Sequence, residues 1–277
     1  MKKKLLSLAM LGALSALSGN VLAEEAAAPA AAEPASPHTF SYNLGLFSQY
    51  IWRGMTQTDE ELALQGGIDY AHSSGFYAGA WASNVSWTTD TPASMPAYEP
   101  FMDSGSLELD LYAGYAGTFG KSDFGYNVGL LQYVYPGTTN SNYVGTKEAP
   151  NTNATELYGA LSYKWANVKA SYTLSDEAWG FDNADGTWYI EANADIPIGE
   201  SGYTINLHVG DFQFDGKSFG VDNDNYDYTD WKVGVTKAWS NGVKLGAYYT
   251  DNNADHSFWL LKEQTDGQFT VFVQKIF

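Results

Sequence analysis

The chain has 277 residues, a formal net charge of −18 from 32 acidic and 14 basic residues, and a mean hydropathy of −0.29. The acidic excess argues against nucleic acid as a partner, because phosphates would be repelled, and the absence of cysteine excludes a disulfide scaffold. The 9 Trp, 20 Tyr and 14 Phe of this polar chain are typical of a membrane barrel with an apolar outer face, a polar lumen and aromatic rims.

Residues 1–23 are expected to be a signal peptide. Residues 2–4 are lysines, residues 5–17 form a short apolar segment, and residues 21–23 (Val-Leu-Ala) have the character of a cleavage site. The apolar segment is shorter than the ~20 residues that a membrane-spanning helix needs, and no later stretch approaches that length. We therefore expect an exported chain that crosses a membrane only as strands.

Residues 24–38 are rich in Ala, Pro and Glu and have no periodicity, so we interpret them as a disordered periplasmic linker. The alternative is a helix that plugs the barrel. Pro29, Pro34 and Pro37 argue against it, because each interrupts a helix. No second shift in composition follows, and residues 39–277 are interpreted as one domain.

Apolar and polar residues alternate through twelve segments of this domain. Because successive side chains of a strand point to opposite faces, this alternation places one face in lipid and the other in a lumen. In the clearest segment, Leu109 and Leu111 face out while Glu108 and Asp110 face in. The expected strands cover about residues 39–53, 62–71, 76–87, 107–119, 124–135, 157–165, 168–174, 188–196, 203–209, 231–235, 243–249 and 269–277.

The segments between these strands alternate strictly between short and long. The short ones are 72–75, 120–123, 166–167, 197–202 and 240–242, and the long ones are 54–61, 88–106, 136–155, 175–186, 211–229 and 250–268. The sequence therefore predicts an all-β, antiparallel transmembrane β-barrel of about 12 strands, with short periplasmic turns, long extracellular loops and both ends in the periplasm. A soluble β-sandwich, the alternative, does not require this pattern of connector lengths.

Two stretches carry a resemblance to a known family. The last strand, residues 269–277 (FTVFVQKIF), resembles the aromatic-terminated strand that outer-membrane proteins present to the barrel-assembly machinery. Residues 42–58 (YNLGLFSQYIWRGMTQT), 64–79 (LQGGIDYAHSSGFYAG) and 81–87 (WASNVSW) are similar to the opening of the TorF-type porin family of proteobacterial outer-membrane proteins. The resemblance implies a channel in the cell outer membrane of a Gram-negative bacterium, and it transfers no site residues.

Strand parity assigns each charge of the barrel to a location. The candidate pore-lining acids are Asp69, Glu108, Asp110, Glu156, Glu191, Asp195 and Asp230, and the candidate pore-lining bases are Arg53, Lys164, Lys169, Lys232 and Lys244. These nearly balance, so the acidic excess lies in the long loops, for example in residues 59–61 and 222–227. We expect a porin or channel for passive diffusion of small polar solutes, with a weak cation preference that is set at the acidic mouth.

Arg53 is the only arginine of the chain, and the parity of the first strand places it in the lumen with Tyr50 and Trp52 on the outer face. Its planar donor fork is suited to clamping a substrate anion or pairing with a wall acid such as Asp69. We favour the structural pairing.

Lys237 and Lys275 fall on the outer face near periplasmic strand ends, where a lysine reaches the head groups.

Asp222, Asp224 and Asp227 alternate along one loop and form a weak candidate metal site, because carboxylates are ligands for Ca²⁺. The loop lacks the glycine and the downstream glutamate of the helix-flanked calcium loop. A solvated acidic loop is the favoured interpretation, with weak bridging of divalent ions to lipopolysaccharide as an intermediate one.

A hydrolase is the least favoured class. His256 with Asp251 or Asp255 would be its candidate pair, while His38 lies in the linker and His208 faces the lumen near Asn206. No serine nucleophile motif, metal-ligand cluster or phosphate-binding loop accompanies them. We therefore expect no enzymatic activity and no cofactor.

The sequence is compatible with a narrow or a wide lumen. Bulky residues on the lumen parity would either constrict it or line a stacking path for solutes: Phe47, Tyr112, Tyr158, Tyr189 and Tyr248. A closed barrel used for adhesion or structure is thus an alternative to a channel. The expected partners are outer-membrane lipids, lipopolysaccharide and the barrel-assembly machinery, and the expected state is a monomer.

Overall fold

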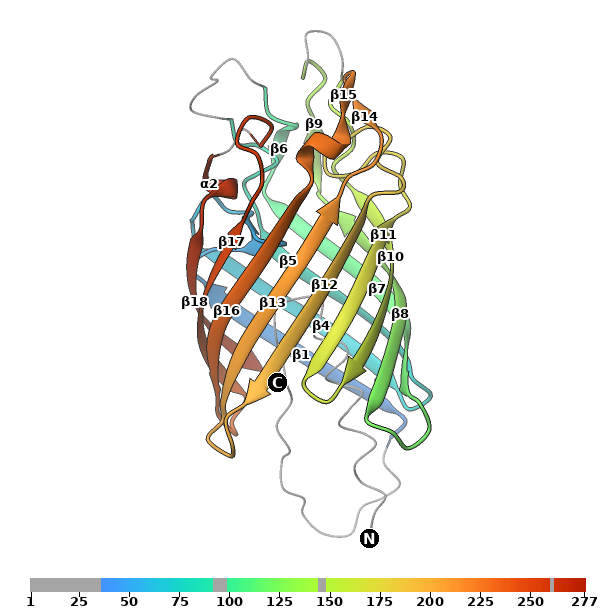
Figure 1. The fold of residues 1–277 in the computed structure, drawn as a ribbon, viewed down its shortest axis with the longest axis vertical. Helices are drawn as coiled ribbons and strands as arrows, with labels where there is room; N and C mark the ends of the chain where they lie inside the picture. The colour runs from blue at the N-terminus through green and yellow to red at the C-terminus, as the bar shows by residue number, and fades with distance from the viewer. Residues whose placement is uncertain (1–35, 92–98, 144–147, 260–261) are drawn as a thin grey trace.

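Twelve antiparallel strands close into a barrel in the computed structural model, which describes residues 36–91, 99–143, 148–259 and 262–277 (Figure 1). The expected signal peptide and nearly all of the expected linker lie outside the described residues. The barrel strands are β1 (His38–Phe47), β4 (Ala63–His72), β5 (Phe76–Asn84), β7 (Leu107–Thr118), β8 (Phe124–Val134), β10 (Ala154–Tyr163), β11 (Ala166–Thr173), β12 (Trp188–Pro197), β13 (Tyr203–Gln213), β16 (Tyr228–Ala238), β17 (Val243–Asn252) and β18 (Gln268–Ile276).

Each strand pairs with its sequence neighbours in the wall, and β1 closes the barrel by pairing with β18 as well as β4. The closing register aligns Asn43 with Ile276 and Phe47 with Phe272. The predicted fold class and number of strands are confirmed.

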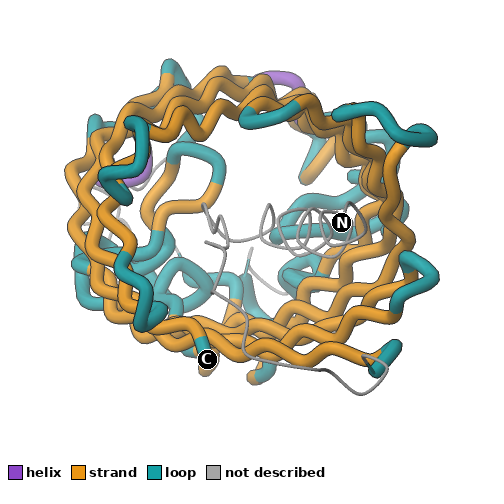
Figure 2. Tube along the Cα trace, turned by 90° about the horizontal axis from the view of Figure 1, so that it is seen from below, coloured by secondary structure: helices purple, strands orange, loops and turns teal. Residues whose placement is uncertain are grey.

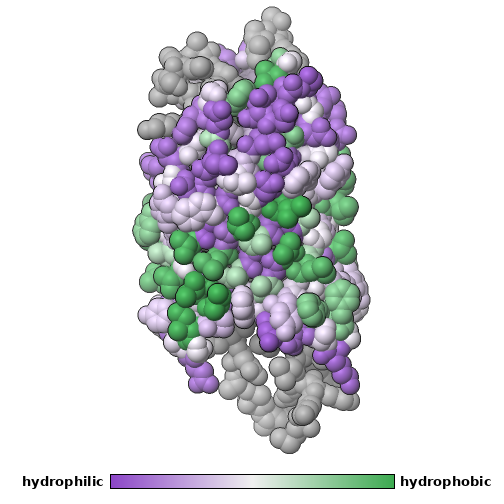
Figure 3. All heavy atoms as spheres, in the orientation of Figure 1, coloured by the Kyte–Doolittle hydropathy of each residue, from purple (hydrophilic) through white to green (hydrophobic). Residues whose placement is uncertain are grey.

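Burial follows the predicted alternation along each wall strand. On β7, Leu107 and Leu111 are 41% and 46% exposed on the outer face, whereas Glu108 between them is 1% exposed on the inner face. Apolar side chains gather over the lower and middle wall in Figure 3, and polar ones gather toward the end with the long loops. An apolar outer face of this kind is suited to contact with lipid.

The two ends of the barrel differ in the length of their connections (Figure 1). One end, here named the short-turn end, carries residues 73–75, 119–123, 164–165, 198–202 and 239–242. The other, the long-loop end, carries the six longer connections. These contain the small elements β2 (Ile51–Trp52), β3 (Met55–Thr56), β6 (Met102–Gly105), β9 (Gly137–Thr139), β14 (Lys217–Ser218), β15 (Val221–Asp222), η2 (Asn223–Tyr226) and α2 (Lys262–Thr265).

None of the helices in the described ranges has the length and apolar character needed to cross a membrane.

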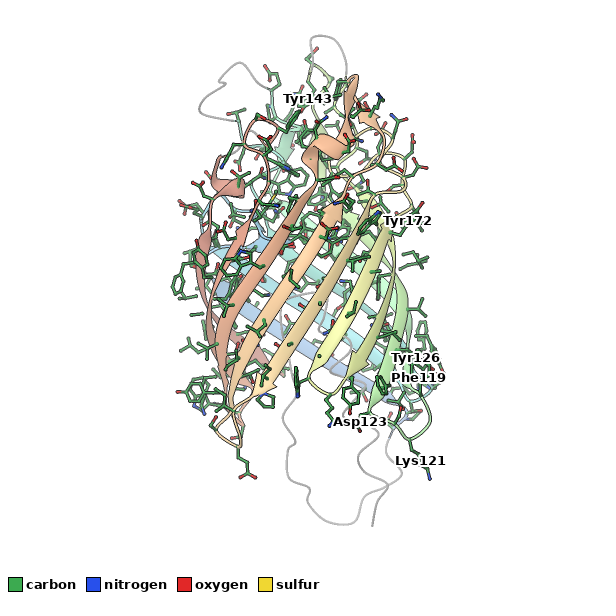
Figure 4. The ribbon with its side chains drawn as sticks, viewed as in Figure 1. Phe119, Lys121, Asp123, Tyr126, Tyr143 and Tyr172 are labelled. Carbon is green, nitrogen blue, oxygen red and sulfur yellow. The ribbon has the colours of Figure 1, made fainter. Side chains whose placement is uncertain are left out.

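Side chains at the short-turn end have the contacts expected of a membrane rim. The ammonium group of Lys237 donates to the carbonyl of Ser201 and lies over the ring of Tyr203. Lys275 likewise donates to the carbonyl of Asn241. Phe119 and Tyr126 lie near this end in Figure 4, and Tyr172 lies toward the other end of the wall. Both lysines thus bond to the short turns, where parity predicted them.

Three expectations about the wall were wrong. The first strand ends at Phe47 rather than Arg53, so Tyr50 and Trp52 leave the wall and lie inside the barrel. The turn between β10 and β11 is formed by Lys164 and Trp165, so Lys164 is exposed in a turn and does not line the lumen. His38 belongs to β1, where it pairs with His72, rather than to the linker.

Candidate functional site

The connection between β1 and β4 folds back into the barrel as a hairpin of β2 and β3, here named the inward hairpin (residues 51–56). Its turn is Arg53-Gly54, and both residues have positive φ, 45° and 79°, as a type I′ hairpin turn requires. Figure 2, which looks along the barrel, shows strand and loop segments inside the ring of wall strands.

Arg53 lies at the tip of the inward hairpin, and its side chain contacts the opposite wall of the barrel. One guanidinium nitrogen, Nη2, donates to both carboxylate oxygens of Glu156 on β10, at 2.7 and 2.8 Å. The guanidinium carbon lies 4.4 Å from the ring centroid of Tyr189 on β12. In the closed strand order, β10 and β12 flank β11, the strand opposite β1. The hairpin therefore spans the lumen.

The Arg53–Glu156 pair is buried, with side-chain exposures of 6% and 1%. The ring centroids of Trp52 and Phe212 lie 4.4 and 4.5 Å from the guanidinium carbon, which adds cation–π attraction at a desolvated site. Glu156 also accepts a hydrogen bond from the hydroxyl of Tyr133 at 3.1 Å. A buried ion pair needs such additional partners, because desolvation of both charges offsets much of their attraction.

Other strands hold the rest of this connection. The side-chain amide of Asn252 on β17 donates to the carbonyl of Gly54 at 3.0 Å and to that of Gln264 at 2.9 Å. The hydroxyl of Tyr50 donates to Glu108 on β7 at 2.7 Å. A Cβ added to Gly54 would lie 2.4 Å from Cβ of Asp230. The turn therefore needs glycine for space as well as for its φ.

A second polar network lies beside the Arg53 clamp on the inner wall. Asp230 accepts a hydrogen bond from the hydroxyl of Tyr189 at 2.8 Å, and its other oxygen lies 2.9 Å from Nε2 of His208. Lys169 pairs with Glu191 at 2.8 Å. Glu108, Glu156, Glu191 and Asp230 are thus each engaged by arginine, tyrosine, histidine or lysine, whereas one carboxylate oxygen of Asp110 is buried without a hydrogen-bond partner among the described residues.

Toward the short-turn end the lumen is polar and only partly buried. Asp69 accepts a hydrogen bond from Tyr112 at 2.5 Å, and Asp195 accepts one from Asn206 at 2.6 Å. The ammonium group of Lys232 lies 5.3 Å from the ring centroid of Tyr248. Asp69, Asp195 and Lys232 are all of intermediate exposure. Charged groups of both signs are therefore partly accessible in this part of the lumen, although neighbours such as Lys244 and Gln274 are buried.

The inner wall holds the charged residues predicted for it, apart from Arg53 and Lys164: Asp69, Glu108, Asp110, Glu156, Lys169, Glu191, Asp195, Asp230, Lys232 and Lys244. Their role in lining a pore stays a prediction. Arg53 lies on the inward hairpin rather than the wall, and its partner is Glu156 rather than Asp69.

The large lumen residues have different roles. Phe47 stacks on Phe272 with centroids 4.8 Å apart. The hydroxyl of Tyr158 bonds to that of Tyr77, which also donates to Asn127. These side chains fill or cross-link the wall.

Two carboxylates of the acidic loop after β13 have partners within the protein. Asp222 pairs with Lys217 at 2.6 Å, which raises the pKa of that lysine. Asp227 accepts the backbone N–H of Phe214 at 2.7 Å, although burial raises the pKa of its carboxyl group. Within the described ranges, no group of three or more His, Asp or Glu side chains is arranged to hold a metal ion. The weak metal site at Asp222, Asp224 and Asp227 is therefore not supported.

The candidate hydrolytic pair is not formed by hydrogen bonding. Nδ1 of His256 bonds to the hydroxyl of Thr265, whereas Asp255 accepts hydrogen bonds from the backbone and hydroxyl of Ser257, which lower the pKa of its carboxyl group. His208 bonds to Asn193 and Asp230 rather than to Asn206.

Sequence reasoning missed the inward hairpin, although a signal was present. Residues 51–56 read Ile-Trp-Arg-Gly-Met-Thr, and a two-residue turn that ends in glycine between two short strand-forming segments is a hairpin pattern. It also missed Glu156 as the partner of Arg53 and the contacts of Trp179 and Phe212 with the guanidinium group. Those depend on which part of the opposite wall the hairpin reaches.

Comparisons with known proteins bear on the family and on the fold. A family model described as "Bacterial protein of unknown function (Gcw_chp)" matches residues 31–277. It does not carry the TorF-type name, which stays a prediction. Among curated protein sequences, none matches this chain.

Solved structures of outer-membrane channels share the architecture. The COG4313 outer membrane channel from Pseudomonas putida F1 gives a TM-score of 0.51 at 11% identity, over 88% of this chain and 96% of that one. The KdgM porin gives 0.47 at 12% identity, over 85% and 98%. The NanC porin gives 0.44 at 10% identity, over 86% and 98%. At these identities the likeness is one of fold.

Proposed function

The chain belongs to the Gcw_chp family of bacterial proteins of unknown function, and we propose that this member is an outer-membrane channel for small polar solutes. The inward hairpin is its constriction. The observation that carries the proposal is a contrast between two levels of the lumen. At the inward hairpin, Arg53 pairs with Glu156 across the lumen. Between the hairpin and the short-turn end, charged groups such as Asp195 and Lys232 are partly exposed. A lumen used only for structure gains nothing from keeping charges in contact with water.

Conductance in a planar bilayer tests this function. The native protein should give small single-channel steps, because the hairpin crosses the lumen. A variant with residues 50–57 replaced by a short Gly-Ser linker should give steps several-fold larger, as the constriction is removed. If neither protein conducts, although both migrate as folded barrels on unheated gels, the closed structural or adhesion barrel is the better description.

We also propose a weak cation preference that arises at the mouth. The long loops carry acids such as Asp59, Glu60 and Asp224, whereas the inner wall holds acids and bases in near balance. Loop charges act over roughly one Debye length, ~8 Å at physiological ionic strength, so they enrich cations at the vestibule. The reversal potential across a KCl gradient measures the preference, and firm anion selectivity at low salt would exclude it.

The proposed location is the outer membrane, with lipid and lipopolysaccharide around the wall and the barrel-assembly machinery as the partner during insertion. The apolar outer face and the lysines at the short-turn end support it. Separation of inner and outer membranes on a sucrose gradient tests the location. Recovery of the native protein in the soluble or inner-membrane fraction would contradict it.

A further inference from the structure

Beyond the inward hairpin, the long loops enclose a cavity of about 260 Å³, here named the vestibule cavity. Each of the six long connections contributes at least one aromatic residue to the wall of this cavity. One from each connection, in chain order, is Trp52, Phe101, Tyr143, Phe181, Phe219 and Trp259. Tyr143 is labelled among the long loops in Figure 4. The floor includes Trp52 and Met55 of the inward hairpin. The cavity therefore lies directly over the constriction.

Contacts between rings of different loops hold the walls of the vestibule cavity in place. Phe101 stacks on Tyr143 with centroids 5.0 Å apart, and Tyr143 lies 5.6 Å from Phe219. Phe181 and Trp259 meet edge to face at 6.2 Å. Such aromatic pairs have geometric preferences that oppose collapse. The cavity is thus a preformed site, which is the usual condition for binding a small molecule.

Apart from two carboxylates, few polar groups of the wall are available to a ligand. The side-chain amide of Gln57 donates to its own hairpin at Met55 and Thr56, and the hydroxyl of Ser218 is engaged with the backbone of Asp182. A sugar would leave most of its hydroxyl groups unmatched in such a site, and each unmatched group costs free energy. A flat apolar ring matches the wall better, because it gains aromatic contact without that cost.

Charge narrows the ligand class further. The indole N–H groups of Trp87 and Trp179 are buried although both residues line the wall, so they are not presented to a ligand as donors. Asp90 and Glu99 also line the vestibule cavity, and their carboxylates disfavour an anion there.

Volume sets the size of the ligand. A cavity of ~150 Å³ accommodates benzene, and pockets for drug-sized ligands begin at ~300 Å³. The vestibule cavity lies between these values, so it takes one substituted ring or two fused rings.

We propose that the vestibule cavity is a binding site for a small, neutral or cationic aromatic compound. The site goes beyond the proposed function: the channel concerns polar solutes that cross the lumen, whereas this ligand would be held above the hairpin that constricts it. Trp52 is in contact with both, because its ring forms the cavity floor and lies against the guanidinium group of Arg53.

Isothermal titration calorimetry on the full chain in detergent micelles tests the site, with protein-free micelles as the blank. The probes are benzyl alcohol, benzylamine, benzoate and glucose. We expect saturable binding of the first two, binding of benzoate weaker by about tenfold or more because of the carboxylates, and none of glucose. Equal binding of benzoate, or tighter binding of glucose, would overturn the assigned ligand class.

A cavity-filling variant ties binding to this place. Val221 lines the cavity and is 42% exposed, so Val221→Trp occupies space without removing a buried contact. It should weaken benzyl alcohol binding about tenfold or more. Ile198→Trp, at an exposed position of a short turn, is the matched control and should bind as the native protein does. Unchanged affinity of Val221→Trp, with native migration on unheated gels, would overturn the site.

A second variant tests the contribution of one wall ring to binding, and a conductance measurement separates the ligand site from the channel. Phe219→Ala removes an exposed ring at the cavity edge and should weaken binding by a smaller factor than Val221→Trp. Conductance measured on the same preparation separates the two proposals. A conducting protein without saturable binding overturns only the ligand site, whereas binding without conductance overturns the channel and leaves the site standing.

Discussion

The two halves of the lumen obey different packing rules although one set of strands builds both. Toward the long loops, the acids Glu108, Glu156 and Asp230 are each 1% exposed and are held by tyrosine or arginine. Toward the short turns, Asp69 accepts a hydrogen bond from Tyr112 and Asp195 one from Asn206, yet both acids remain partly exposed. The difference is the inward hairpin, which turns one half into a protein core and leaves charged groups of the other half partly exposed. A returning loop, more than the wall itself, thus decides the character of the lumen.

The largest effect is expected when one partner of the buried ion pair is removed. Glu156→Ala leaves Arg53 buried without its counter-charge, and we expect a loss of about 3–5 kcal/mol in the free energy of unfolding. Conductance should rise because the hairpin is released. Urea unfolding followed by tryptophan fluorescence measures the first effect, and bilayer recording measures the second.

The double variant Arg53→Met with Glu156→Leu is the control for this ion pair. It removes both charges and keeps volume, so it should recover most of the lost stability. If the double variant is less stable than Glu156→Ala, the pair is not the contact that holds the hairpin.

Substitutions at two glycines separate the cost of backbone strain from the cost of overpacking at the hairpin tip. Gly54 and Gly120 both have positive φ, 79° and 62°, but a Cβ at Gly54 would press on Asp230 while one at Gly120 meets nothing within 4 Å. Gly120→Ala should cost about 1 kcal/mol from backbone strain. Gly54→Ala should cost about 2–4 kcal/mol, since overpacking adds to that strain. Equal costs in the same unfolding experiment would mean that the hairpin tip is not packed on the wall.

Removal of single hydroxyl groups compares the two halves directly. Tyr135 donates to Glu108 in the buried half, and Tyr112 donates to Asp69 in the partly exposed half. Tyr135→Phe should cost about 1.5–3 kcal/mol, the range for a hydrogen bond to a charged group. Tyr112→Phe should cost less, because water can replace the lost donor at Asp69. The reverse order would show that water does not reach the lumen below the hairpin.

The wall could be predicted from the sequence because lipid imposes one rule on every strand. An apolar residue at each second position, as in Leu107, Leu109 and Leu111, reports the fold locally. The lumen follows no such rule. Tyr50 and Trp52 continue the alternation of β1 past Phe47, so their apolar character suits a lipid face and a core equally well.

The Arg53–Glu156 contact joins residues 103 positions apart, and no local pattern specifies it. The same holds for the vestibule cavity, whose rings come from six separate connections. Each aromatic residue could be read as part of a loop, but which of them meet depends on how the closed wall brings the loops together. Charges were easier to place, because parity assigned Glu191 and Asp230 to the inner face without knowledge of their partners.

The smallest expected effect lies at the mouth, outside both halves of the lumen. Replacement of Asp59, Glu60 and Glu61 by Asn, Gln and Gln removes three charges at one connection of the long-loop end. Stability should change little, because surface charges contribute a median of about 0–1 kcal/mol. The cation preference should fall at ~0.01 M salt, where the Debye length is ~30 Å, and the variant should match the native protein at 1 M, where it is ~3 Å. Glu200→Gln, at a short turn, is the control at the opposite end. A preference that survives in the triple variant at low salt would place the selecting charges on the inner wall, and the partly exposed half of the lumen would then act as the filter.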